Sequence, residues 1–170
     1  MNLTSTSRSC RRRAPIVLTF LLLATVSPLP AVEGDDQQPL YLESDSAELD
    51  EQASTSVYTG NVFVKQGSME IRADEVTVHH DPDRRPKRIV AVGNPAKYRQ
   101  DVEGETKKVE AEALRMEYEA DAEEITLIDQ ALLFQGEDTF RSDRIVYDRA
   151  RARVKAGTSA QGKERVKIFI

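Results

Sequence analysis

Apolar residues recur at every second position in many short segments of this chain. The spacing is found at 62–64, 76–78, 114–118 and 152–156. Successive side chains of a β-strand point to opposite faces of a sheet, so this spacing predicts strands with one buried face. The segment 107–119 is rich in residues that favour helices, but its three large apolar residues at spacing two predict a strand there as well.

Short segments rich in Gly, Asn and Pro separate the predicted strands. Gly adopts backbone angles that other residues avoid, and Asn and Pro favour turns. We expect turns between strands at Thr59-Gly60-Asn61, Gln66-Gly67-Ser68, Gly93-Asn94-Pro95 and Gln135-Gly136-Glu137, and a charged loop from Asp81 to Lys87. The chain is therefore predicted to be all-β.

Strands and turns recur as a repeat of about 30 to 40 residues. Each unit opens with an acidic step followed by alternating apolar residues, at Ser44-Asp45, Ala73-Asp74, Glu112 and Ser142-Asp143. A glutamine lies further along the units, at Gln66, Gln100 and Gln135. Repeats of this length are typical of stacked units that share one core. The expected fold is an elongated, twisted, open β-jelly roll built from repeated antiparallel strand units.

The first 31 residues differ in composition from the rest. Four arginines at positions 8 and 11–13 precede an apolar stretch over 14–26, and the segment 27–31 contains two prolines and ends in Ala31. This arrangement is typical of a secretory signal peptide, the alternative being a short membrane anchor that is retained. We expect cleavage after Ala31, a polar lead-in over 32–39 and one domain over 40–170.

Charge and cysteine content narrow the function further. Cleavage would remove Cys10, the only cysteine, and would change the net charge from −5 to −9. Such an acidic chain is a poor nucleic-acid binder, and without cysteine it must be held by its apolar core. Residues 33–51 contain eight acidic and no basic residues, whereas residues 141–170 contain nine basic and three acidic ones.

Catalytic and metal-binding signatures are weak in this sequence. The cluster His79-His80-Asp81-Pro82-Asp83 resembles metal ligands, but neighbouring strand residues point to opposite faces, so its two histidines are not expected to share an ion. The sequence contains neither a Gly-x-Ser-x-Gly elbow nor a Gly-rich phosphate loop. We expect no enzyme, no metal and no cofactor.

Four segments together carry a family resemblance. They are 38–45 (QPLYLESD), 58–67 (YTGNVFVKQG), 73–74 (AD) and 93–100 (GNPAKYRQ). In this order they resemble the LptA/OstA-like family of periplasmic lipopolysaccharide-transport proteins, over nearly all of 32–170. The resemblance implies a V-shaped β-jelly roll in the periplasm of a Gram-negative bacterium. It also implies transport of lipopolysaccharide between an LptC-like inner-membrane partner and an LptD-like outer-membrane partner.

One segment departs from the family pattern, because Ile128-Asp129-Gln130 stands where the family usually has Gly. Two alternatives remain open. The fold family also includes LptC-like subunits that keep an N-terminal anchor, so the chain is either a free carrier or an anchored subunit of the same pathway. The other alternative is a closed periplasmic β scaffold that links partners without binding lipid.

The alternating apolar residues define a candidate site. If the two layers of the jelly roll splay apart, these residues line a groove in which each buried CH₂ group of an acyl chain contributes about 0.8 kcal/mol. If the layers close, the same residues form an ordinary core. The inward candidates by parity are Leu40, Leu42, Val62, Val64, Ile71, Val76, Val78, Tyr98, Leu114, Met116, Leu133, Ile145 and Tyr147.

The two ends of the predicted solenoid differ in charge and expose end strands. Unpaired backbone groups on an end strand favour addition of a further strand, and opposite charges favour contact between unlike ends. We therefore expect a head-to-tail homo-oligomer, or addition of a related jelly roll from a partner. The apolar residues expected at these edges are Leu40, Tyr41 and Leu42 at one end and Val166, Ile168 and Ile170 at the other.

Overall fold

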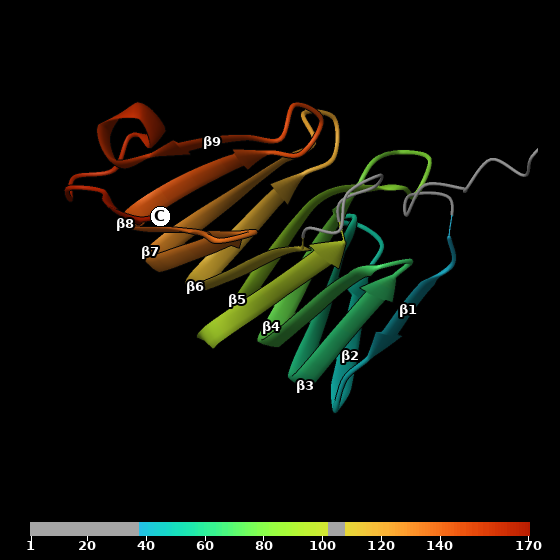
Figure 1. Cartoon of the computed structure of the whole chain (residues 1–170). Helices are drawn as coiled ribbons and strands as arrows, with labels where there is room; N and C mark the ends of the chain where they lie inside the picture. The colour runs from blue at the N-terminus through green and yellow to red at the C-terminus, as the bar shows by residue number, and fades with distance from the viewer. Residues whose placement is uncertain (1–37, 102–107) are drawn as a thin grey trace, which may run out of the picture. The chain divides into compact units, whose positions relative to one another are not determined.

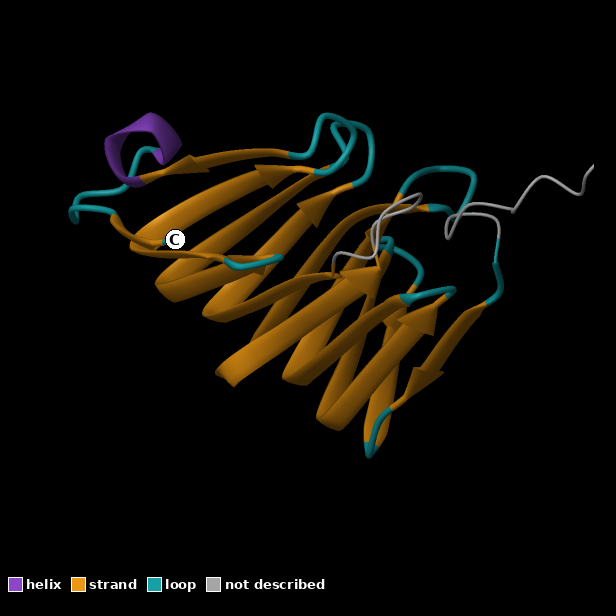
Figure 2. Cartoon of the chain, viewed as in Figure 1, coloured by secondary structure: helices purple, strands orange, loops and turns teal. Residues whose placement is uncertain are grey.

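The computed structural model describes residues 38–101 and 108–170, which form one antiparallel sheet (Figures 1 and 2). The strands are β1 (Leu40–Glu43), β2 (Ser46–Asp50), β3 (Thr55–Gln66), β4 (Met69–His80), β5 (Pro86–Asp101), β6 (Lys108–Glu119), β7 (Glu124–Gln135), β8 (Asp138–Asp148), β9 (Arg153–Ala156) and β10 (Lys167–Phe169). A short 3₁₀ helix, η2 (Gly157–Ala160), follows β9. No helix within these ranges is long and apolar enough to span a membrane. The predicted signal peptide lies outside the described residues.

The long strands β3 to β8 follow one another across the sheet in chain order, each antiparallel to the next. Each edge of the sheet is made by two short strands. β1 and β2 both pair with β3, and β9 and β10 both pair with β8. Because these pairs stand at opposite ends of the pairing order, the sheet is open (Figure 1).

Every long strand is interrupted near its middle, and the interruptions are aligned across the sheet. The ladders shift register between Thr59/Val62, Arg72/Glu75, Val92/Ala96, Glu112/Arg115 and Ile128/Ala131. Irregularities of this kind bend a strand and change which side chains face inward. The line of interruptions, here called the bend, therefore divides the sheet into two halves that face each other.

The two halves are named by the short strands at their edges. The β2–β9 half consists of β2, 55–59, 75–80, 86–92, 115–119, 124–128, 144–148 and β9. The β1–β10 half consists of β1, 62–66, 69–73, 96–101, 108–113, 131–135, 138–142 and β10. The mouth is the opening between the free ends of these halves, on the side away from the bend.

Left-handed backbone conformations form the bend in two of the strands. In β3 they occur at Gly60 (φ 83°) and Asn61 (φ 47°), and in β7 at Asp129 (φ 59°) and Gln130 (φ 54°). A side chain at position 60 would collide with Asp45, which explains the glycine there. At Asp129 and Gln130 the same bend forms without glycine, so this departure from the family pattern leaves the strand path intact.

Two of the predicted turns are corrected by this arrangement. The segments 59–61 and 93–95 lie within β3 and β5 and bend them, instead of reversing the chain between strands. The predicted turns at 66–68 and 135–137 are confirmed as hairpins. The charged loop that follows His80 ends sooner than expected, because β5 begins at Pro86. The strand predicted over 107–119 is confirmed as β6.

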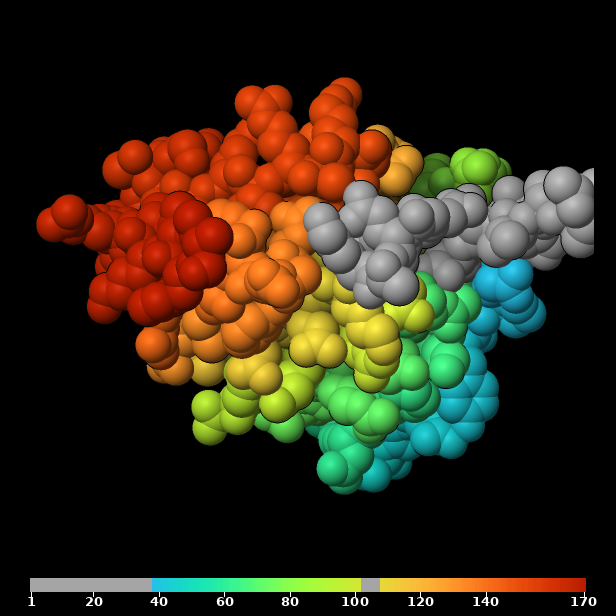
Figure 3. Space-filling view, viewed as in Figure 1, coloured from blue at the N-terminus to red at the C-terminus, as the bar shows by residue number. Residues whose placement is uncertain are grey.

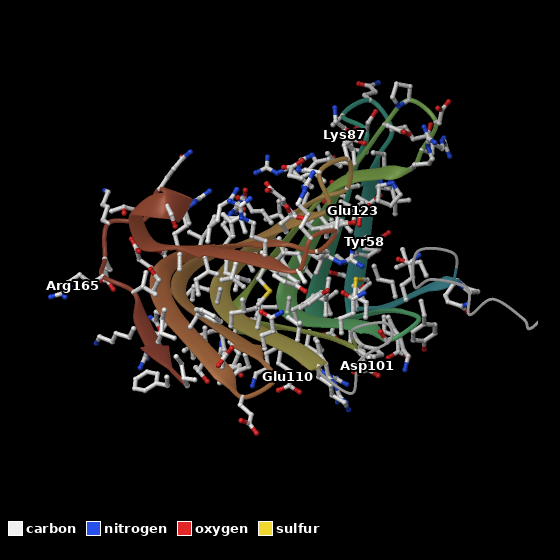
Figure 4. All side chains as sticks on the ribbon, turned by 45° about the horizontal axis from the view of Figure 1, so that its top comes forward. Tyr58, Lys87, Asp101, Glu110, Glu123 and Arg165 are labelled. Atoms are coloured by element: carbon white, nitrogen blue, oxygen red, sulfur yellow. The ribbon has the colours of Figure 1, made fainter. Side chains whose placement is uncertain are left out.

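On the inner face of the β1–β10 half, four strands place a small residue next to the bend. These residues are Ala73, Ala96, Ala113 and Ala131, and all are buried. Larger side chains such as Leu133 stand farther from the bend on that half. On the β2–β9 half the larger Val76, Met116, Leu127 and Ile145 stand next to the bend and are also buried. Figure 4 shows side chains filling the space between the halves.

We predict that Ala113→Leu destabilises the domain. Ala113 is fully buried beside the bend, so three additional carbon atoms must push the halves apart, at a cost of about 1–3 kcal/mol in the free energy of unfolding. Urea denaturation of both proteins measures this difference. The control is Ala122→Leu at an exposed turn, which should change stability by less than about 0.5 kcal/mol. Equal effects at both positions would contradict a tight fit at the bend.

Candidate functional site

The inner faces of the two halves form one continuous apolar core, which extends from β3 to β8. Ten of the thirteen predicted groove residues belong to this core: Val62, Val64, Ile71, Val76, Val78, Tyr98, Met116, Leu133, Ile145 and Tyr147. Leu42 is partly buried against it. The pattern of alternation therefore identified the inner faces, and binding of lipid by these residues stays a prediction.

The structure corrects the placement of Leu114. Leu40 stands on the same face as Leu42 and Val64, as the parity predicts, but on the edge strand β1 it is 48% exposed. Leu114 lies at the bend, where the inward position passes from Ala113 to Met116, a spacing of three residues instead of two. Leu114 consequently lies outside the core, beside Asp129 in a surface depression near the C-terminal segment. An unbroken alternation through 114–118 gave the wrong face for this residue.

Several core residues were not among the sequence candidates. They include Met69, Ala91, Val109, Ala111, Ile125 and Leu127. Apolar residues also recur at every second position over 109–113 and 125–127, and this spacing could have identified most of these core residues. The alanines were missed because a small residue is a weak hydrophobic marker.

The space between the halves is open at the end formed by β1 and β2. A pocket of about 610 Å³ lies there. Its lining is mixed, because Leu42, Ala47 and Tyr58 stand beside the polar residues Glu43, Ser44, Asp45 and Asn61. Leu42 and Tyr58 also pack against the core, so one side of the pocket borders the apolar interior.

The mouth is lined by polar side chains, in contrast to the interior. Gln100 ends the inner row of β5 in the β1–β10 half, and Tyr118 ends that of β6 in the β2–β9 half. Arg149, just after β8, bridges these residues. Its Nε donates a hydrogen bond to Oε1 of Gln100 at 3.1 Å, and its Nη1 donates one to the Tyr118 hydroxyl at 3.1 Å. The Tyr98 hydroxyl also hydrogen-bonds Gln100.

The rims beside the mouth are charged. Lys87 and Glu123 stand at the rim of the β2–β9 half, and Asp101 stands at the other rim (Figure 4). The interior is therefore apolar over its depth and polar where it meets solvent, which is the arrangement that an amphiphilic ligand requires.

Ion pairs on the outer face hold carboxylates in their charged form. Burial alone would raise the pKa of Glu117, but hydrogen bonds from Arg115 and Arg88 at 2.6 and 2.7 Å outweigh it, so the pKa is lowered. A hydrogen bond from Arg151 likewise lowers the pKa of Asp148. These shifts arise from structural ion pairs and do not indicate a catalytic acid or base.

The histidine cluster offers no chelate within the described residues. His80 Nε2 lies 3.0 Å from the Ser56 hydroxyl, while His79 stands opposite Arg88 of the next strand. In the ranges 38–101 and 108–170, no group of three or more His, Cys, Asp or Glu side chains is arranged to hold a metal ion.

The two edges of the sheet lie at opposite ends of the domain (Figure 3), and both expose apolar side chains. Leu40 and Tyr41 are about half exposed at the β1 edge, and Ile168 and Ile170 are exposed at the β10 edge. Val166 is only partly exposed, just before β10. The predicted edge residues thus lie on or beside the edge strands, and their contact with another chain stays a prediction.

A carboxylate at the bend of β8 holds the segment between β9 and β10. Oδ2 of Asp143 accepts a hydrogen bond from the Lys163 backbone N–H at 2.6 Å. This hydrogen bond is the main reason that the pKa of Asp143 is lowered. The segment 157–166 is thereby fixed against β8, and β10 is placed at the sheet edge.

Comparisons with known proteins agree with this geometry. Residues 41–153 match the family described as LptA/(LptD N-terminal domain) LPS transport protein. Over 143 residues the chain is 36% identical to the lipopolysaccharide export system protein LptH of Pseudomonas aeruginosa, covering 84% of this chain and 82% of LptH. Over 133 residues it is 37% identical to LptA of Escherichia coli K12, covering 78% of this chain and 71% of LptA.

A solved structure shares the fold. The crystal structure of LptH, the LptA-homologous periplasmic component of the lipopolysaccharide transport device of Pseudomonas aeruginosa, superposes with a TM-score of 0.72 at 35% identity. The match covers 80% of this chain and 97% of the LptH chain. The predicted all-β, open jelly-roll architecture is thereby confirmed.

We predict that Asp143→Asn lowers the melting temperature at pH 7 and that this difference disappears in acid. A lowered folded-state pKa adds stability above the unfolded-state pKa, and this stability is lost as the pH falls through the folded value. The difference should therefore shrink below the ordinary value of 3.8. Thermal melts between pH 7 and pH 2.5 measure it.

Asp121→Asn is the matched control, because Asp121 lies exposed in the turn between β6 and β7. Its melting temperature should follow that of the unsubstituted protein at each pH. A difference for Asp143→Asn that is as large in acid as at neutral pH would show that the charge of Asp143 is not what holds the segment 157–166.

Proposed function

Because the chain belongs to the LptA/(LptD N-terminal domain) family of lipopolysaccharide transport proteins, we propose that it carries lipopolysaccharide across the periplasm from the inner to the outer membrane. In this proposal the chain is one element of a bridge, and the acyl chains lie between the two halves of the sheet. The observation that carries it is the continuous apolar interior, to which every long strand of the sheet contributes.

The interior suits acyl chains in chemistry and in direction. Its apolar residues come from every long strand. An acyl chain lying parallel to the bend would therefore contact apolar side chains at each strand that it crosses. Each CH₂ group removed from water contributes about 0.8 kcal/mol. Side chains fill the interior in the described structure, and many of its members are less than 5% exposed. Loading therefore requires the two halves to move apart.

The proposed activity is that of a carrier and not of an enzyme. The related proteins are named as components of a lipopolysaccharide export system. The lowered carboxyl pKa values of Glu117 and Asp148 are explained by their arginine partners. Directional transport by such a carrier would draw its energy from another component of the pathway.

Export and cleavage after Ala31 belong to the same proposal. The LptH relative is described as a periplasmic component, and the arginine-rich start followed by an apolar stretch supports export. The family match to LptA and to the LptD N-terminal domain favours a free carrier over an anchored LptC-like subunit. The apolar interior favours a lipid carrier over a scaffold that only links partners.

We propose that the two edges join the carrier to its neighbours. At the β1–β2 edge the described acidic residues include Glu43, Glu48 and Asp50, and at the β9–β10 edge the basic residues include Lys155 and Lys167. Pairing of unlike edges would extend the sheet head to tail and would continue the apolar interior from one molecule to the next. The same edges would accept LptC-like and LptD-like jelly rolls.

We predict that lipopolysaccharide crosslinks to the inner face only. A photo-reactive side chain at Tyr98 or Leu133, both buried between the halves, should capture lipopolysaccharide. The matched controls are the neighbouring positions Lys97 and Leu132, which point to the outer face of the same strands. Immunoblotting for the crosslinked lipid measures capture, and circular dichroism verifies folding of each variant. Equal capture at neighbouring positions would exclude the space between the halves as the binding site.

We predict that the full chain forms concentration-dependent oligomers that weaken with salt, and that deletion of residues 165–170 gives monomers that still bind lipid. The deletion removes β10, which presents the free edge of the β1–β10 half. Sedimentation velocity at several salt concentrations measures both effects.

A second variant retains the strand but reverses its charge. The double variant Arg165→Glu, Lys167→Glu places two negative charges at exposed positions. These charges would repel the acidic β1–β2 edge, so association should weaken as it does on deletion. A closed dimer that is indifferent to salt, to the deletion and to charge reversal would rule out pairing of unlike edges.

A further inference from the structure

Arg149 is the side chain that closes the mouth over the core. It continues the inner row of β8, two residues beyond Tyr147 and four beyond Ile145, which are both buried. Its hydrogen bond to Gln100 reaches the opposite half of the sheet. Opening the mouth to admit acyl chains would therefore break this contact.

The partners of Arg149 are neutral. Within residues 38–101 and 108–170, its side chain bonds the Gln100 amide oxygen and the Tyr118 hydroxyl, and its guanidinium carbon lies 5.4 Å from the centre of the Tyr118 ring. Nearby arginines have carboxylates instead: Arg88 binds Glu117, and Arg151 binds Asp148. A half-buried guanidinium without a carboxylate retains its capacity to bind an anion.

The surroundings of Arg149 leave that capacity free. Asp148, the neighbouring carboxylate, is held by the side chain and the backbone N–H of Arg151. The backbone of Arg149 is fixed because its N–H donates to the Glu123 carbonyl at 3.0 Å. When the mouth opens, the hydrogen bond to Gln100 in the opposite half is lost, whereas Tyr118 belongs to the same half as Arg149, so the guanidinium stays at this rim.

We propose that Arg149 binds a phosphate group on the head of the lipid cargo, and that Gln100 occupies this position in the empty protein. An acyl chain that contacts Tyr147 and Ile145 would leave its head group at the mouth, roughly 7 Å farther along the strand. The planar guanidinium fork matches two oxygens of a phosphate, a match that neither an amide nor a hydroxyl provides.

This inference rests on the proposed function and specifies the part of the cargo that the protein recognises. The phosphate would replace Gln100 as the acceptor, so loading would exchange a neutral contact across the mouth for a charged contact to the cargo. Release of the cargo would restore the bridge between Arg149 and Gln100 and close the mouth. Both states keep the guanidinium hydrogen-bonded.

The test compares one lipid with and without its phosphates. The exported full-length protein is titrated with hexa-acylated lipid A bearing two phosphates, and with the same lipid after removal of both phosphates. The unsubstituted protein should bind the phosphorylated lipid more tightly. Arg149→Met should weaken that binding roughly 10- to 100-fold and should leave binding of the dephosphorylated lipid unchanged or tighter, because the bridge across the mouth is lost. Arg149→Lys should bind the phosphorylated lipid with an affinity between those of the unsubstituted protein and Arg149→Met.

Arg99→Met is the matched control, since Arg99 precedes Gln100 on the same strand, points to the outer face and carries the same charge. It should keep the preference for the phosphorylated lipid. Inorganic phosphate should not displace the lipid; displacement by phosphate at the concentration of the lipid would indicate a site for free phosphate and overturn the proposal.

Two further outcomes separate this inference from the carrier function. If Arg149→Met weakens binding of both lipids equally, Arg149 only stabilises the contact between the two halves. Phosphate recognition is then overturned, while the carrier function stands. If the unsubstituted protein binds neither lipid, the carrier function itself is overturned, and recognition of the phosphate is overturned with it.

Discussion

The structure depends on one constraint, which is that all long strands must bend at the same level of the sheet. A strand that ran straight through the bend would carry its second half away from the core, and its alternate side chains would face solvent. The strands meet this requirement by different local means. β3 and β7 use two left-handed residues, and β5 uses the segment Gly93–Ala96 with a cis peptide bond at Asn94–Pro95. What they share is the position of the bend and the return of apolar residues to the inner face after it.

The bend also sets how the interior is filled. Alanines of the β1–β10 half and larger residues of the β2–β9 half, such as Met116 and Leu127, are buried beside it, and polar residues meet solvent at the mouth. Side chains from both halves fill the interior of the described residues. In the proposed loading step the halves would therefore have to separate, with the bend as the hinge, and the contact between Arg149 and Gln100 would break.

Each edge of the sheet consists of two parts separated by an interruption, as each long strand does, but the interruption differs in length between the two edges. β1 and β2 are two parts of an edge strand interrupted only at Ser44-Asp45, so both halves of the sheet end at the same level. β9 and β10 correspond to them at the other edge, but the ten residues 157–166 separate them. Asp143 fixes this longer insertion against β8. The two edges are therefore unlike in shape as well as in charge.

The sequence by itself determined the class of fold, most of the strands and the family. Spacing of two marks a half-buried strand wherever it occurs, and the hairpins at 66–68 and 135–137 follow from local turn chemistry. The tertiary structure decided whether Gly60-Asn61 and Gly93-Asn94-Pro95 reverse a strand or bend it, because the same residues suit both and only pairing with the neighbouring strands distinguishes them. It also decided the face of Leu114, since the alternation breaks where the sheet folds. The contact between Arg149 and Gln100 joins residues 49 positions apart, and no local pattern indicates it, because their proximity arises only when two halves of a bent sheet close on each other.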